Sequence, residues 1–140
     1  MVLSPQRVPT DVTESSAASV FLDGLTNRDY ARLASALDGD VRFRALLPSG
    51  PNEWHGPDQV AGVLRGWFGS ADDFVVVGTT RADVAGRTQM TWRFRLRPAP
   101  FEIGDGWHVI EQHAFADATA ASIQALDLVC SGFRPDVTTG

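Results

Sequence analysis

The chain has 140 residues, a net charge of −5 and a pI near 5.0, with 44% hydrophobic and 21% charged residues. This length and composition are typical of one globular domain, which buries roughly two-thirds of its unfolded surface without a disulfide or a metal. The acidic balance argues against nucleic acid and against an anionic membrane as partners, because both are bound by clustered basic residues.

The first half of the chain predicts three helices and one strand. After a flexible leader over residues 1–13, the elements are a helix from Glu14, a helix over Asp29–Leu37, a strand over Val41–Ala45, a loop over Pro48–Asn52 and a helix beginning at Pro57. Apolar residues at helical spacing predict the helices, and alternation predicts the strand. Thr13, Ser15 or Ser16 caps the first helix.

The second half of the chain predicts strands. They cover Phe74–Val77 with a continuation to Ala82, Thr88–Arg97, Trp107–Asp117 and Ser122–Phe133. Consecutive strands joined by short turns pair antiparallel, and helices grouped on one side of such a sheet make an α+β layer. We therefore predict one α+β domain over residues 14–134, with a tail over 135–140, in which a curved sheet encloses a single pocket.

Cysteine usage and the N-terminal region predict the compartment. Cys130 is the single cysteine, so no disulfide forms within the chain. No apolar run is long enough to span a bilayer, and Met1–Ser16 lacks the apolar region of a secretory signal. These features predict a cytoplasmic protein.

The order of elements resembles that of the nuclear transport factor 2-like superfamily, and within it the SnoaL-like branch of small bacterial proteins. The residues that carry the resemblance, over about positions 15 to 134, are Phe21–Leu25 with Asn27–Tyr30, Asp40–Phe43, Trp54–Gly56, Val109–Asp117 and Ile123–Cys130. The resemblance implies a cystatin-like cone, in which a bent antiparallel or mixed sheet packs on three N-terminal helices around a hydrophobic pocket. It also implies a homodimer through the convex side of the sheet.

The resemblance implies cofactor-free acid–base chemistry on a hydrophobic or polyketide-like metabolite, as in cyclases, isomerases, dehydratases and epoxide hydrolases. The family's catalytic residues do not map cleanly onto this chain. The isomerase base falls on Ala45 or Leu46, which cannot accept a proton. The cyclase acid falls on Gln112 or His113, and the last-strand acid of the epoxide hydrolase falls one residue from Asp127. A one-residue slip in a strand moves a side chain to the other face.

Two arrangements of the last two strands are open. In one, His113 lies across from Asp127, with Glu111 on the same face and Arg93 or Arg95 nearby. A carboxylate that fixes one imidazole nitrogen leaves the other free as a general base. In the other, which the apolar alternation favours, this charged ladder lies on the convex side and faces solvent or a partner.

The favoured arrangement leaves Gln112 and Cys130 as the polar groups of the pocket, beside Trp92. The candidate catalytic residues are Gln112, His113 and Asp127. The candidate substrate-binding residues are Phe43, Trp54, His55, Trp67, Trp92, Leu128 and Cys130. A structural role is the alternative for each of them: aromatic core residues, a loop-packing His55 and a small buried Cys130. His108 is expected to be exposed.

Nothing in the sequence predicts a cofactor. Phosphate-binding and dinucleotide-binding loops are missing, and the three histidines are scattered rather than spaced as metal ligands. Three functions are open: an enzyme acting on a hydrophobic small molecule, a non-catalytic binding protein with the same pocket, and a dimerisation module.

Overall fold

The computed structural model describes residues 16–101 and 103–136, so the predicted leader and most of the predicted tail lie outside the described residues. The helices are α2 (Ala17–Thr26), α3 (Tyr30–Ser35) and α4 (Pro57–Phe68). The strands are β1 (Leu37–Leu47), β2 (Gly50–His55), β3 (Asp73–Val84), β4 (Arg87–Arg97), β5 (His108–Ala118), β6 (Ile123–Cys130) and β7 (Arg134–Pro135).

The helix starts follow from their capping residues. Ser16 caps α2 and accepts a hydrogen bond from the backbone N–H of Ser19 at 3.3 Å. Asp29 does the same for α3, and Pro57 stands at the start of α4. The prediction that α3 continues to Leu37 is wrong, because Leu37 instead begins β1 and pairs with β6. Pairing with a neighbouring strand overrides the local helical pattern there.

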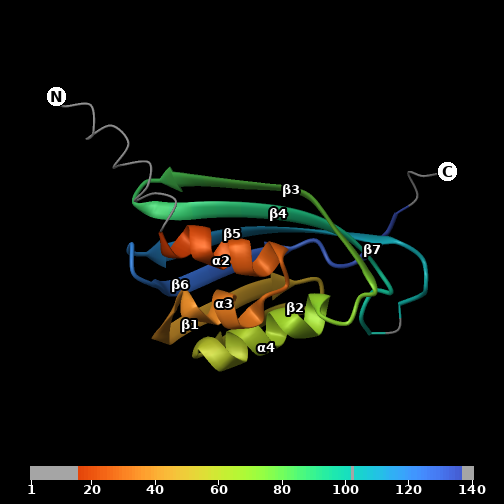
Figure 1. Cartoon of the computed structure of the whole chain (residues 1–140), viewed down its shortest axis with the longest axis horizontal. Coiled ribbons are helices and arrows are strands. Elements are labelled where there is room, and N and C mark those ends of the chain that lie inside the picture. The colour runs from red at the N-terminus through yellow and green to blue at the C-terminus, as the bar shows by residue number, and fades with distance from the viewer. Residues whose placement is uncertain (1–15, 102, 137–140) are drawn as a thin grey trace.

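The sheet is mixed, with strand order β2-β1-β6-β5-β4-β3 and β7 pairing with β5. β1 and β6 are parallel, whereas the other neighbours are antiparallel. The sheet bends around the three helices, which lie on its concave side (Figure 1). The predicted α+β fold with a curved mixed sheet on three helices is therefore confirmed.

Two predicted boundaries are wrong in a way that affects the site. The loop predicted over Pro48–Asn52 is mostly strand: only a tight turn precedes β2, whose Pro51 is tolerated because β2 is an edge strand. The long last strand is broken after Cys130. Gly132 adopts a φ of +80°, which favours glycine, and β7 then resumes pairing with β5.

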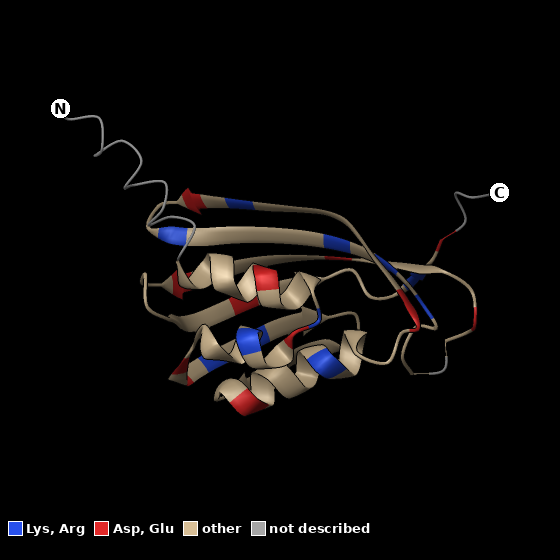
Figure 2. Ribbon diagram, viewed as in Figure 1, with Lys and Arg blue, Asp and Glu red and all other residues tan. Residues whose placement is uncertain are grey.

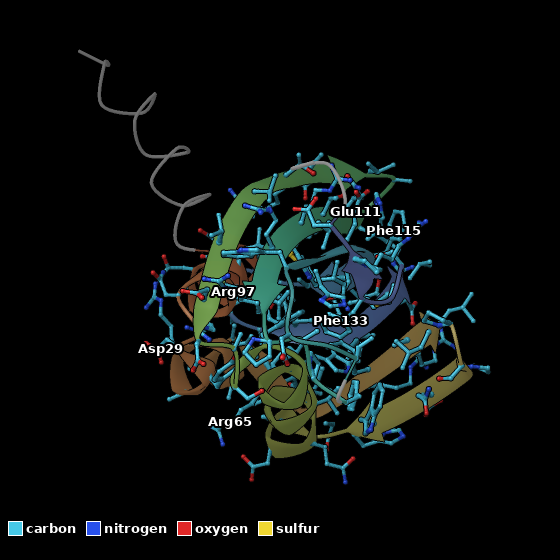
Figure 3. All side chains as sticks on the ribbon, turned by 90° about the vertical axis from the view of Figure 1, so that its right-hand side faces the viewer. Asp29, Arg65, Arg97, Glu111, Phe115 and Phe133 are labelled. Atoms are coloured by element: carbon cyan, nitrogen blue, oxygen red, sulfur yellow. The ribbon has the colours of Figure 1, made fainter. Side chains whose placement is uncertain are left out.

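The core fills the space between the concave face and the helices. The largest fully buried side chains include Phe21 from α2, Phe68 from α4 and Trp92 from β4. Figure 3 views the molecule along the strands and shows the sheet bent around this core, with Phe133 near the middle. Acidic and basic residues are interspersed over helices and strands rather than separated (Figure 2).

Candidate functional site

The register of β5 separates the candidate catalytic residues. Gln112 pairs with Cys130 of β6 and is fully buried on the concave face. His113 is the next residue, so its side chain points to the convex face. Asp127 lies opposite Phe115, on the convex face as well. The structure therefore does not bring Gln112, His113 and Asp127 together.

A short chain of hydrogen bonds crosses the concave face from β4 to β6. The indole Nε1 of Trp92 donates to Oε1 of Gln112 at 2.6 Å, and Nε2 of Gln112 donates to Sγ of Cys130 at 3.2 Å. The backbone N–H of Gly132 also donates to this sulfur, at 3.3 Å. An indole N–H can only donate, so Trp92 fixes which end of the Gln112 amide faces Cys130. The predicted grouping of these three side chains is present.

The other predicted pocket residues from the strands and α4 form an aromatic group at one end of the concave face. The ring centroids of Phe43 and Trp54 are 5.2 Å apart, and each lies 6.3 Å from the ring of Trp67. Leu128 is 3% exposed on the same face. His55 lies apart from them: its neighbour Trp54 faces inward, so the His55 side chain faces outward, where it is exposed and contacts Glu53 at 2.8 Å.

Side chains fill the concave face rather than leaving it open. Phe43, Trp92 and Gln112 have no exposed surface, and Trp67 is 7% exposed. The residues at the edge of this region are only half-buried: Leu47, Trp54, Cys130 and Phe133. Phe133 packs between Phe68 and Phe101, with ring centroids 6.3 and 6.4 Å away, and stands at the end of the sheet that Figure 3 faces.

His108 is a concave-face residue that the sequence reasoning missed. It was expected to be exposed, but it is 4% exposed and lies on the same face of β5 as Gln112. Its Nδ1 is 2.9 Å from the carbonyl oxygen of Gly106. A carbonyl only accepts, so Nδ1 is the nitrogen that donates to it. The signal was available, because His108 continues the apolar alternation of Ile110.

The convex face carries the charged ladder, as the favoured arrangement predicted. Oε2 of Glu111 is 2.8 Å from Nε2 of His113, and Oε1 of Glu111 is 3.3 Å from Nε of Arg93. Nδ1 of His113 lies 3.3 Å from the hydroxyl of Thr91. Glu111 and Phe115 project from the outer side of the sheet in Figure 3. The register that placed His113 across from Asp127 is wrong, since His113 faces Val129.

Asp127 is held in ion pairs. Nε of Arg44 donates to its Oδ1 at 2.7 Å, and Nη2 of Arg87 donates to its Oδ2 at 3.0 Å. The hydrogen bond from Arg44 lowers the pKa of the Asp127 carboxyl, against the opposing effect of partial burial and with further help from Arg87. Both oxygens are thus engaged by arginines, which is the arrangement of a structural ion pair rather than of a general base.

The described part of the chain contains no group of three or more His, Cys, Asp or Glu side chains placed to hold a metal ion. Within residues 16–101 and 103–136, no helix has the length and apolar character needed to cross a membrane.

Comparison with known proteins gives structural matches alone. No protein-family model matches the sequence, and no curated protein matches it. A candidate polyketide cyclase from Xanthomonas campestris is 13% identical, with a TM-score of 0.63 over 81% of this chain and 86% of that one.

Two further solved structures are similar to the same extent. A candidate SnoaL-like polyketide cyclase from Shewanella putrefaciens is 13% identical, with a TM-score of 0.59 over 81% of this chain and 77% of that one. A candidate ketosteroid isomerase from Kribbella flavida is 14% identical, with a TM-score of 0.59 over 86% of this chain and 79% of that one. The chain therefore has the nuclear transport factor 2-like fold, which it shares with these solved structures.

Proposed function

We propose that the protein binds a small hydrophobic molecule on the concave side of its sheet and recognises one polar group of that molecule through the Gln112 amide. The observation that carries this proposal is the burial of Gln112 among apolar and aromatic side chains. Trp92 and Cys130 each engage one end of the amide. One N–H and one oxygen lone pair remain, which suit a hydroxyl or carbonyl group of a ligand.

The interior side chains are closely packed, so a ligand enters only where the packing is loosest. Half-buried Cys130 meets this condition, and its sulfur is hydrogen-bonded to the Gln112 amide. Ligand sites are commonly apolar and aromatic with a few polar groups that fix orientation. The cyclase and isomerase candidates that share the fold support the same class of ligand, a hydrophobic ring compound.

The test is to extract the purified protein with organic solvent and to identify any released small molecule by mass spectrometry. We expect wild type to release an apolar compound that carries a hydroxyl or carbonyl group. We expect Gln112→Leu to retain roughly fivefold to tenfold less of it, because one hydrogen bond contributes about 1 kcal/mol. Arg32→Gln, on the far side of the helices, is the control. An empty wild-type protein, or equal retention by Gln112→Leu, would contradict the proposal.

Proton transfer at the concave face is a second candidate function, and the burial of His108 on this face favours it. His108 and Gln112 are four residues apart on β5, roughly 13 Å at the rise of an extended strand. A ligand that touches both groups therefore has to span several fused rings. Deuterium incorporation into the recovered compound in D₂O tests this function. We expect incorporation with wild type and with His113→Gln, and its loss with His108→Gln; equal incorporation by all three proteins would rule out His108 as the base.

A further inference from the structure

A hollow of about 360 Å³ opens on the convex face and shares Cys130 with the concave site. It lies where β6 ends and β7 takes its place beside β5. The lining residues are Arg93, Val109, Glu111, His113, Val129, Cys130, Ser131 and Arg134. The hollow lies at the break between β6 and β7, where Ser131 still donates its backbone N–H to the carbonyl oxygen of Glu111 at 3.0 Å before β7 resumes pairing.

Charge in the hollow is opposite in sign to that of the whole protein. Two guanidinium groups, those of Arg93 and Arg134, face one carboxylate, that of Glu111, whereas the chain carries a net charge of −5. Glu111 is already engaged by Arg93 and His113. The backbone of Arg134 pairs with Val109 in the β5–β7 ladder, whereas its exposed guanidinium makes no hydrogen bond or ion pair with any residue in the described ranges, so the guanidinium donors are available. The hollow is therefore complementary to a ligand with one negative charge.

The apolar residues that line the hollow indicate the chemistry of the uncharged part of the ligand. Both valines line the hollow: Val129, which is 52% exposed, lies opposite His113, and half-buried Val109 lies opposite Arg134. Val109 therefore offers apolar surface next to the Arg134 guanidinium. A guanidinium binds a planar carboxylate through two parallel hydrogen bonds. We propose that this hollow binds a small organic carboxylate, with its carboxylate on Arg134 and its apolar body against Val109.

The test is titration of the full chain with sodium benzoate at low ionic strength, monitored by the backbone amide signals of β5 and β7 in NMR spectra. Benzamide, which has the same shape without the charge, and inorganic phosphate, which has charge without an apolar body, are titrated in parallel. We expect benzoate to shift the signals of Val109, Ser131 and Arg134 with a dissociation constant on the order of 1 mM. We expect benzamide and phosphate to bind at least about tenfold more weakly, since charge-assisted hydrogen bonds and apolar contact each contribute.

Matched charge variants locate the site. Arg134→Gln should weaken benzoate binding by about tenfold or more, because it removes the charged donor. Arg32→Gln changes the net charge by the same amount but lies on the helices, paired with Asp23, and should leave the affinity unchanged. Equal weakening by both variants, binding of phosphate as tight as that of benzoate, or no benzoate binding would overturn the proposal. A dimer that covers this face and excludes benzoate would overturn it equally.

Discussion

The two faces of β5 show how one strand places similar side chains in opposite environments. Its inward residues include His108 and Gln112, both under 5% exposed, whereas the outward residues Glu111 and His113 are reached by water. A buried polar group that loses its partner costs about 1–3 kcal/mol, whereas an exposed ion pair contributes about 1 kcal/mol or less. The single hydrogen-bonded amide inside should therefore matter more to stability than any one ion pair of the outer ladder.

The largest contrast is expected at two adjacent residues of β4. Trp92→Ala should reduce the free energy of unfolding by about 3–5 kcal/mol, because it leaves a large cavity in the core. Arg93→Ala, one residue further on the outer face, should cost about 1 kcal/mol or less, since its partner Glu111 stays hydrated. Urea unfolding of the two variants measures both values. Similar losses would contradict the separation of the two faces.

Gln112 and His113 give the second contrast. Gln112→Leu should cost about 1–3 kcal/mol, because the indole N–H of Trp92 is then buried without an acceptor. The double variant Trp92→Phe with Gln112→Leu removes both partners and should cost less than the sum of the two single changes. His113→Leu should change stability by no more than about 0.5 kcal/mol. Thermal unfolding measures these losses for Trp92→Phe, Gln112→Leu, their double variant and His113→Leu. Simple additivity in the double variant would count against the buried hydrogen bond.

Asp127 sharpens the comparison on the outer face, because it has the best-formed ion pairs there. Asp127→Asn should cost about 1 kcal/mol or less at pH 7, because the pairs with Arg44 and Arg87 are exposed to solvent. The pKa of Asp127 is lowered in the folded state, so this contribution is present above its ordinary value of 3.8 and is lost as the pH falls through the folded-state pKa. The stabilities of wild type and Asp127→Asn should therefore converge below about pH 4, as denaturant unfolding at several pH values will show. A gap that widens in acid would contradict the ion-pair assignment.

Tyr30→Phe is expected to have the smallest effect on the free energy of unfolding, and unlike the other changes it should not destabilise the protein. The Tyr30 hydroxyl is buried without a hydrogen-bond partner among residues 16–101 and 103–136, and burial raises its pKa, although Arg28 and Arg65 oppose the rise. Any stability linked to this raised pKa is present below its ordinary value of 10.0 and is lost as the pH rises through the folded-state value. Tyr30→Phe removes an unsatisfied polar group and should be neutral or stabilising by up to about 1 kcal/mol at pH 7. A clear loss of stability would show that the hydroxyl has a partner.

The sequence predicted which face of the sheet a side chain lies on better than it predicted where strands begin and end. Strict alternation along β4 and β5 placed Trp92 and Gln112 inside and Glu111 and His113 outside, because the period of a strand is two. Pairing between distant segments decided the rest. The loop at Pro48–Asn52 became an edge strand by pairing with β1, and the register of His113 depended on a turn whose geometry no local pattern specifies.

The sequence predicted which residues lie at the concave site but not how closely their side chains pack. The aromatic residues and the Trp92–Gln112–Cys130 group were found from alternation, but their close packing depends on how three helices fill the concave face. His108 was predicted to be exposed because it precedes the core of the strand predicted over Trp107–Asp117, although it keeps the period of Ile110. The homodimer and the catalytic roles of Gln112, His113 and Asp127 stay predictions.

Hydrogen–deuterium exchange of the tryptophan indole protons tests the central claim, that the hydrogen-bonded Gln112 amide sits in a closed core on the concave face. The Nε1 proton of Trp92 is donated to Gln112 with no exposed surface, whereas Trp54 is half-buried at the edge. We predict exchange at Trp92 that is on the order of a thousandfold slower than at Trp54, because it requires opening of the core. Comparable exchange at the two indoles would contradict this account.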